Sequence, residues 1–343
     1  MCRDIIIKNI PGCDESGVLD PKVYEVATNP EKYKFERTDV DKSFTFNNIP
    51  VGMIRSIMGW NNEDLTTTNI STEYKEIPGE ECNIPVRIYS PQSDEKLPCF
   101  VFIHGGGFIG GGLDTVENPC KLIAERTPAV VVSVDYRLAP EAPYPKGFND
   151  CFDVIKWVYN NGDEINVDVN RIGVGGDSAG GNLSAVCTLK DKDLKTNMIK
   201  YQALIYPAVT MSEKEVEYYK WDINEYEMNK DKEIIENMVC SLKDSNDMLV
   251  GAYLQNPAYC EDRYVSPLLA DDLSGLPKTL VVVAEYDFLR VQGEAYAKKL
   301  VENNVDCRAI RYKGVDHAFI DKLGLYSQAE DCVNEIAKDL QSL

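Results

Sequence analysis

A serine flanked by glycines is the first part of this sequence whose residue types predict chemistry. Gly176 and Gly180 stand two positions before and two positions after Ser178. The apolar run 172–174 precedes this motif and small and apolar residues follow it, which predicts a strand, a sharp turn and a helix. At so tight a turn, a side chain at either glycine position would collide with the neighbouring strand or helix. The pattern indicates a serine nucleophile at the turn, and the alternative is a glycine-rich turn whose serine has no special role.

Two histidines, His104 and His317, are the candidates for a base that would activate the serine. A serine hydroxyl is a weak nucleophile unless a base accepts its proton. His104 comes directly before three glycines at the end of an apolar run, where its side chain would orient the glycine loop by hydrogen bonding. His317 follows the last predicted strand, in a loop from which a side chain can reach the nucleophile. We therefore predict that His317 is the general base.

A carboxylate is expected to orient this histidine and to stabilise its protonated form. Asp287 follows the predicted strand 279–284 and precedes a predicted helix, which places it at the same edge of the sheet as Ser178. Glu285 is the nearest competitor and comes earlier in the turn. Asp316 adjoins His317, but neighbouring residues rarely place their side chains for this hydrogen bond. We therefore predict that Asp287 is the orienting carboxylate.

Glycines 105–107 predict a loop whose backbone N–H groups can approach an acyl oxygen. They follow the apolar run 98–104 directly. Acyl transfer forms an oxyanion, and one preorganised donor typically contributes roughly 3–4 kcal/mol to its stability in the transition state. The N–H of Ala179, at the start of the predicted helix, adds a further donor. The alternative interpretation is a flexible glycine loop.

Charge and length restrict the classes of partner and the number of domains. The chain has 343 residues, 44% of them hydrophobic, and a net charge of −20. This length suits one large α/β domain with additions or two ordinary domains. The negative charge would repel nucleic acid and anionic membrane surfaces, so we expect neither as a partner.

Targeting segments and metal sites are not expected. The first ten residues hold a three-residue apolar run, which is too short for a signal peptide, and no apolar run reaches transmembrane length. Eleven cysteines are scattered without a Cys-x-x-Cys pair, so neither a metal site nor a disulfide framework is expected. We expect reduced thiols in a cytoplasmic protein that needs no cofactor or metal and is a monomer or a homodimer.

Short apolar runs alternate with helical patterns from residue 73 onward. Strands are predicted at 73–77, 84–89, 98–104, 129–134, 172–174, 201–206, 279–284 and 307–312. Helices are predicted at 115–126, at 150–159, directly after Ser178, at 291–301 and at 326–340. This alternation predicts an α/β fold with a mostly parallel central sheet that helices cover on both faces.

Two segments interrupt this alternation. Residues 1–70 are polar and aromatic, with short helices predicted at 23–27 and 51–58, and we interpret them as a cap segment outside the core 71–343. Residues 212–263 are charged, predict no strand and include the aromatic residues Tyr218, Tyr219, Trp221, Tyr226 and Tyr253. They follow the strand 201–206, beyond whose end ligand crevices form. We interpret them as a helical cap, and the alternative is a surface insertion without a role.

Several motifs, taken in order, carry a family resemblance. They are His104-Gly-Gly-Gly-Phe108, Asp135-Tyr-Arg-Leu-Ala-Pro-Glu141, Gly176-Asp-Ser-Ala-Gly-Gly181, Ser266-Pro-Leu-Leu269 and Leu276-Pro277. Over residues 75–320 the chain resembles the hormone-sensitive-lipase-like carboxylesterases of the α/β-hydrolase fold. The resemblance implies ester hydrolysis, a helical cap and an oxyanion hole in the His-Gly-Gly-Gly loop. By position it assigns Ser178 as nucleophile, Asp287 as orienter, His317 as base, and Gly106, Gly107 and Ala179 as oxyanion donors.

The chain departs from the family pattern at two places. The family often has an acidic pair after Asp-x-Leu-Arg, where this chain has Val291-Gln292. The family usually has glycine after the catalytic histidine, where this chain has Ala318. These departures leave open how Asp287 is supported and how the loop around His317 is shaped.

The expected function is that of a serine carboxylesterase acting on short-chain or small aromatic esters through an acyl-enzyme. An amidase or a sugar or xylan acetyl esterase with the same triad is an alternative, and so is a lipase acting at lipid–water interfaces. The acidic, tyrosine-rich segment 212–263 favours small dissolved esters over an interface. A non-catalytic small-molecule receptor is a further alternative; the plant gibberellin receptors resemble this family but lack the histidine that is present here as His317.

Overall fold

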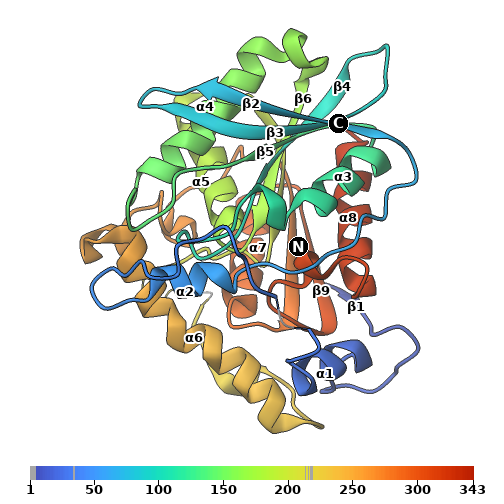
Figure 1. Ribbon diagram of the computed structural model, residues 1–343, viewed down its shortest axis with the longest axis vertical. Coiled ribbons are helices and arrows are strands. Elements are labelled where there is room, and N and C mark those ends of the chain that lie inside the picture. Colours follow the sequence, from blue (N-terminus) through green and yellow to red (C-terminus); the bar gives the residue numbers. More distant parts are fainter. Residues whose placement is uncertain (1–4, 34, 213, 215, 217–218) are drawn as a thin grey trace.

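The computed structural model describes residues 5–343 except 34, 213, 215 and 217–218 (Figure 1). Within these residues the centre of the fold is a nine-stranded sheet with the order β1-β9-β8-β7-β6-β4-β5-β3-β2. The strands are β1 (Ile6–Lys8), β2 (Ile70–Pro78), β3 (Asn83–Pro91), β4 (Leu97–Ile103), β5 (Val130–Val134), β6 (Val167–Asp177), β7 (Ile199–Ile205), β8 (Lys278–Tyr286) and β9 (Cys307–Asp316). Neighbours from β1 across to β5 pair in parallel, whereas β3 pairs with β5 and β2 with β3 in the antiparallel sense. The predicted mostly parallel sheet is confirmed.

The central strands are buried on both faces because their residues are apolar almost without interruption. All five residues of β5 are buried, and so is β8 from Thr279 onward. Successive side chains of a strand point to opposite faces. In β4, Phe100 and Phe102 therefore pack into one layer of the core, and Val101 and Ile103 pack into the other.

Helices cover both faces of this sheet, as predicted. Helices α4 (Lys146–Asn161), α5 (Ala179–Leu194) and α7 (Arg290–Glu302) contribute buried residues to the core on one face. Helices α3 (Glu117–Arg126) and α8 (Ser327–Leu340) contribute to the core on the other (Figure 1). Short 3-10 turns are η1 (Leu113–Thr115), η2 (Gly162–Ile165), η3 (Ile223–Glu225), η4 (Pro257–Glu261), η5 (Pro267–Leu269) and η6 (Phe319–Lys322).

In their described residues, the two segments outside the alternating pattern form the helices α1, α2 and α6 and the strand β1. Helices α1 (Pro21–Thr28) and α2 (Val51–Ser56) belong to the N-terminal segment, and α6 (Lys232–Leu254) belongs to the segment 212–263. In Figure 1, α2 and α6 lie at the same end of the molecule. The N-terminal segment also contributes β1, which pairs with β9 at the edge of the sheet. Tyr218 lies outside the described residues.

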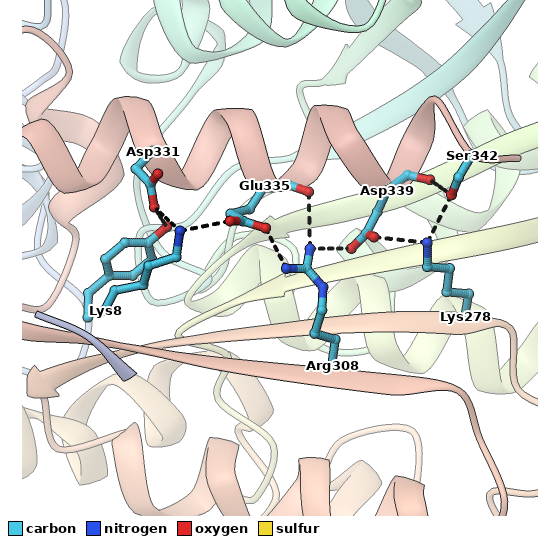
Figure 2. A network of polar contacts seen from close by, with 8 residues as sticks. Lys8, Lys278, Arg308, Asp331, Glu335, Asp339 and Ser342 are labelled. Carbon is cyan, nitrogen blue, oxygen red and sulfur yellow. Dashed lines mark hydrogen bonds and ion pairs between the residues drawn. The ribbon is translucent and has the colours of Figure 1, made fainter. Parts of the chain in front are cut away.

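A row of ion pairs fastens this edge of the sheet to α8 (Figure 2). The contacts alternate along the helix: Lys8 with Asp331 (3.0 Å) and Glu335 (2.8 Å), Arg308 with Glu335 and with Asp339 (2.7 Å), and Lys278 with Asp339 (2.8 Å). The acidic residues are spaced four apart, so they share one face of the helix. The basic residues come from β1, β9 and β8, and Lys8 therefore links the three-residue strand β1 to the main body of the fold.

Candidate active site

Ser178 occupies a strained turn between β6 and α5. Strand β6 ends at Asp177, α5 begins at Ala179, and Ser178 between them has φ 54° and ψ −114°. A Cβ at Gly176 would lie 2.0 Å from the carbonyl oxygen of Ile103, and a Cβ at Gly180 would lie 1.9 Å from the same oxygen. The glycines on either side of the serine are therefore required because β4 passes so close to the turn.

The structure brings Ser178, His317 and Asp287 together although up to 139 positions separate them. His317 Nε2 lies 2.9 Å from Ser178 Oγ, and His317 Nδ1 lies 2.7 Å from Asp287 Oδ2. The Asp287 side chain is fully buried, whereas 21% of the His317 side chain is exposed. An imidazole that donates its Nδ1–H to the carboxylate leaves Nε2 free to accept the serine proton. The three residues follow the ends of β6, β8 and β9 directly.

The two competing carboxylates have other partners. Glu285 is buried, and its Oε2 accepts a hydrogen bond from the backbone N–H of Gly314 at 2.8 Å. Burial raises the pKa of Glu285. Asp316 lies 3.5 Å from the ammonium group of Lys322. Asp287 is therefore the carboxylate in contact with the His317 ring.

The local support of Asp287 comes from the backbone and from a tyrosine. The N–H of Leu289 donates to Asp287 Oδ1 at 2.8 Å. The hydroxyl of Tyr226 donates to the carbonyl oxygen of Asp287 at 2.8 Å. Gln292, which stands where the family often has an acidic residue, accepts hydrogen bonds from Val209 and Thr210 instead. Gln292 therefore binds the loop after β7. The Asp287 carboxylate keeps its hydrogen bond from Leu289 without an acidic residue at position 292.

Ala318 adopts the left-handed conformation for which glycine is favoured. Its φ is 59° and its ψ is 34°. Its carbonyl oxygen lies 3.3 Å from Lys322 Nζ, which also lies 3.3 Å from the carbonyl oxygen of His317. This chain therefore keeps the loop geometry that a glycine would adopt freely, with strain at Ala318.

The glycine loop after β4 faces the serine across a cavity of about 270 Å³. Gly106 and Gly107 line this cavity together with Ser178 and His317. They adopt φ values of 115° and 60°. Ala179 is the first residue of α5, so its N–H is one of the helix's unpaired N-terminal donors, but the residue itself is buried and outside the set that lines the cavity.

The walls of the cavity come from the two segments that the sequence separates from the core. The N-terminal segment contributes Met58 and Trp60, and α6 contributes Leu242 and Leu249. These side chains are mostly apolar. Lys322, which is 6% exposed, adds a cationic group to the lining.

His104 contacts the glycine loop and lies apart from the serine. Its Nδ1 is 2.7 Å from the carbonyl oxygen of Gly105, and its ring stacks on Tyr136 with centroids 4.5 Å apart. The hydroxyl of Tyr136 donates to the carbonyl oxygen of His104 at 3.0 Å. Full burial lowers the pKa of His104 to about 4. The imidazole is therefore neutral at pH 7 and orients the loop.

Two buried carboxyl groups, of Asp177 and Asp321, line the same cavity as Ser178 and His317. Asp177 Oδ1 accepts a hydrogen bond from the N–H of Gly105 at 2.8 Å, and both Asp177 and Asp321 line the cavity. Burial raises the pKa of Asp177 and of Asp321, and the charge of Asp177 adds to the shift at Asp321. The floor of the cavity is therefore less negative at neutral pH than two ordinary aspartates would make it.

Tyr206 and Tyr226 were not among the predicted site residues. The ring of Tyr206 packs edge-on against His317 with centroids 4.8 Å apart, and it follows β7 directly. Its position after a parallel strand was the available signal. Tyr226 belongs to the segment 212–263 and had no local signal beyond the abundance of aromatic residues there.

The described residues contain neither a cluster of metal-binding side chains nor a membrane-spanning helix. No group of three or more His, Cys, Asp and Glu side chains there could hold a metal ion. Among the helices of the same part of the chain, none is long and apolar enough to cross a membrane.

Comparison with known proteins gives one family. Residues 100–321 match the model of a family described as having the alpha/beta hydrolase fold. An arylesterase of Saccharolobus solfataricus is 34% identical over 263 residues, which cover 76% of this chain and 81% of that protein. The carboxylesterase NlhH of Mycobacterium tuberculosis is 35% identical over 243 residues, which cover 70% and 72% of the two chains. A solved esterase structure from Pyrobaculum calidifontis superposes with a TM-score of 0.72 at 38% identity and covers 79% of this chain and 85% of that one.

Proposed function

The chain belongs to the alpha/beta hydrolase fold family and is a carboxylic ester hydrolase, and from this premise we propose that it cleaves short-chain or small aromatic esters through an acyl-enzyme on Ser178. The observation that carries the proposal is the chain of contacts from Ser178 Oγ to His317 Nε2 (2.9 Å) and from His317 Nδ1 to Asp287 Oδ2 (2.7 Å). This geometry suits proton transfer from the serine to the imidazole.

In the first half of the reaction, His317 accepts the proton of Ser178 while the serine oxygen attacks the acyl carbon. The negative charge that forms on the acyl oxygen is stabilised by the backbone N–H groups of Gly106, Gly107 and Ala179. Asp287 stabilises the imidazolium and fixes its orientation. The imidazolium then protonates the leaving alkoxide, which departs and leaves the acyl group on the serine.

In the second half, water takes the place of the alcohol. His317 accepts a proton from the water, whose oxygen attacks the acyl carbon and forms a second oxyanion at the same donors. The collapse of this intermediate releases the carboxylic acid and returns the proton to Ser178. No step requires a group beyond those of the chain and water.

The size and lining of the cavity support small substrates. Its volume of about 270 Å³ is near the lower end of the range of roughly 300–1,000 Å³ that ligand pockets occupy. Met58, Trp60, Leu242 and Leu249 give it apolar walls that suit an acyl or aryl group. Because these walls come from the N-terminal segment and from α6, we also propose that 1–70 and 212–263 act as the cap. Buried thiols, among them Cys99, Cys151 and Cys187, support the proposal of a reducing, cytoplasmic setting.

The test is a p-nitrophenyl ester series from acetate to long acyl chains, measured on the wild type and on Ser178→Ala. We expect activity that is highest on short chains and falls at least about a thousandfold in the variant. A matched p-nitroanilide series separates esterase from amidase activity. Equal activity of the two proteins would refute Ser178 as the nucleophile, and a preference for long chains would refute the proposed substrate class.

A further inference from the structure

The loop that carries two of the proposed oxyanion donors has little conformational preference of its own. Between residues 105 and 112 it includes Gly106 (φ 115°), Gly107 (φ 60°), Phe108 (φ 64°) and Gly111 (φ 83°). Glycine-rich backbone loses much conformational freedom when it is fixed in one shape. Oxyanion donors are effective when they are held in place before the charge develops. Other parts of the molecule must therefore hold this loop.

Contacts with the core hold the first half of the loop. The N–H of Gly105 donates to Asp177 Oδ1 at 2.8 Å. Within the loop, the N–H groups of Ile109 and Gly110 donate to the carbonyl oxygen of Gly106 at 3.1 and 2.9 Å. These bonds close the turn around Gly106 but leave the carbonyl groups of the second half to other partners.

Arg55 of α2 holds the second half from outside the core. Its Nε donates to the carbonyl oxygen of Ile109 at 2.5 Å, and its Nη2 donates to the carbonyl oxygen of Ala139 at 2.9 Å. The two terminal nitrogens also contact both carboxylate oxygens of Glu141 at 2.8 Å. A guanidinium group has five N–H donors in a planar fork, which suits it to hold several acceptors at once. One side chain thus joins the loop to the segment 139–141.

The arginine belongs to the part of the chain that also forms a wall of the cavity. A Cβ at Gly110 would lie 2.4 Å from the sulfur atom of Met58, so the residues after α2 pack directly on the loop. Met58 lines the cavity. A second arginine, Arg37, donates to the carbonyl oxygen of Gly111 at 2.9 Å. Arg37 joins the loop to Asp39 of its own segment, whereas Arg55 joins it to the segment 139–141 of the core, so we expect Arg55 to contribute more to the position of the loop.

We propose that Arg55 is a positioning residue that fixes the oxyanion loop, so that the N–H groups of Gly106 and Gly107 are directed to the acyl oxygen before reaction. The inference rests on the proposed function, because it assigns the loop its role in that reaction. Arg55 is not one of the residues that line the cavity, so it is placed to act through the loop. Its loss should therefore weaken the binding of the transition state more than the binding of the substrate.

The test uses Arg55→Lys and Arg55→Met with Arg171→Met as the matched control. Lysine keeps the charge but lacks the planar fork of five donors, so it can replace fewer of the contacts that Arg55 makes with Ile109, Ala139 and Glu141. Arg171 also contacts one carboxylate, of Asp168 at 2.8 Å, and one carbonyl oxygen, of Lys96 at 2.9 Å. Arg171 lies on β6, seven residues before Ser178, which is about 23 Å along the strand.

We expect both Arg55 variants to lose at least about tenfold in kcat on p-nitrophenyl acetate, with KM changed less than about twofold. Inhibition by an alkyl trifluoromethyl ketone, which forms a tetrahedral adduct with serine, should weaken in the same proportion as kcat/KM. Rates are expressed per active site, by titration with an organophosphate taken to completion. Arg171→Met should remain within about twofold of the wild type. Equal kcat and equal ketone affinity per active site in the Arg55 variants would overturn the proposal.

Amide hydrogen exchange tests the positioning without relying on activity. Peptides that cover 105–112 should exchange at least about tenfold faster in Arg55→Met than in the wild type, whereas peptides from β4 and α5 should not change. Unchanged exchange of the loop would refute the role of Arg55 even if the wild type hydrolysed no ester. An inactive wild type with accelerated exchange in the variant would instead refute the proposed function and leave the positioning intact.

Discussion

Leu249 of α6 packs against Gly107 of the glycine-rich loop 105–112. A Cβ at Gly107 would lie 3.1 Å from both methyl carbons of Leu249, and both residues line the cavity beside Ser178 and His317. The side chain of Leu249 therefore limits the space beside the proposed oxyanion donors. Because α6 belongs to the proposed cap, this contact joins the proposed cap to the proposed oxyanion donors.

Leu249→Ala should shift the acyl preference toward longer chains. Removal of the isobutyl group widens the cavity next to Gly107, and each additional methylene that the cavity accommodates contributes about 0.8 kcal/mol to binding. The ratio of kcat/KM for p-nitrophenyl octanoate to that for p-nitrophenyl acetate should rise about tenfold. Met248→Ala is the control, because Met248 is the preceding residue of α6 and is not among the cavity's lining residues. An unchanged ratio in Leu249→Ala would show that the acyl group binds elsewhere.

Asp287→Asn should reduce kcat by about ten-thousandfold at pH 7 while the protein remains folded. The amide oxygen can accept from the N–H of Leu289 in place of the carboxylate. The amide NH₂ group donates to Nδ1 of His317 and therefore favours the tautomer that carries its proton on Nε2. That tautomer cannot accept the serine proton at Nε2. The measurement is steady-state kinetics on p-nitrophenyl acetate together with circular dichroism.

Glu285→Gln is the comparison for this prediction. Its Oε2 contacts the N–H of Gly314 and an amide oxygen can do the same, so we expect activity within a few-fold of the wild type. A larger loss of activity in Glu285→Gln than in Asp287→Asn would contradict the assignment of the orienting carboxylate.

Residues whose roles depend on local spacing could be predicted from the sequence, and residues that act across distant contacts could not. The turn at Ser178 is specified by glycines two positions away, and His317 and Asp287 follow apolar runs whose ends mark one edge of a parallel sheet. Arg55 contacts Ile109 and Tyr226 contacts Asp287, across 54 and 61 positions, and no local pattern encodes either contact. Strand β1 has three residues and is defined by its pairing with β9, some 300 positions away, so its sequence alone did not indicate a strand.

Acid should destabilise the protein in part through His104. The pKa of this buried imidazole is lowered to about 4, whereas the unfolded chain protonates it near 6.5. Between these values the unfolded state binds more protons than the native state, so stability is lost as the pH falls from about 6.5 to about 4. The full effect of one such group is about 3 kcal/mol below pH 4. The measurement is the free energy of unfolding in urea at pH 8, 6 and 4.5.

The variant His104→Asn isolates this contribution. Asp177 and Asp321 contribute a pH dependence of the opposite sign. Burial raises the pKa of each, so the stability that their protonated native forms contribute falls as the pH rises. Both aspartates are present in the wild type and in the variant, so their contributions cancel when the two free energies of unfolding are subtracted. We expect a shallower loss of stability between pH 8 and 4.5 in the variant. Equal slopes in the two proteins would show that His104 is protonated in the folded state.

Ala318→Gly should stabilise the protein by about 0.5–1 kcal/mol. Ala318 has a φ of 59°, a conformation that costs a non-glycine residue of order 1–3 kcal/mol. Glycine would remove this strain. It would also give the unfolded chain more conformational freedom, which lowers stability by only about 0.4–1 kcal/mol. The contact from Lys322 is made to the backbone oxygen of Ala318 and survives the change. The measurement is the free energy of unfolding in urea.

Ala337→Gly in α8 is the matched control and should lose at least about 1 kcal/mol, because glycine is unfavourable within a helix. Because the backbone conformation of His317 should not change in Ala318→Gly, kcat of this variant on p-nitrophenyl acetate should stay within about twofold of the wild type. A loss of both stability and activity would contradict the prediction. It would mean that packing of the Ala318 methyl group against the loop stabilises the protein by more than the backbone strain at Ala318 destabilises it.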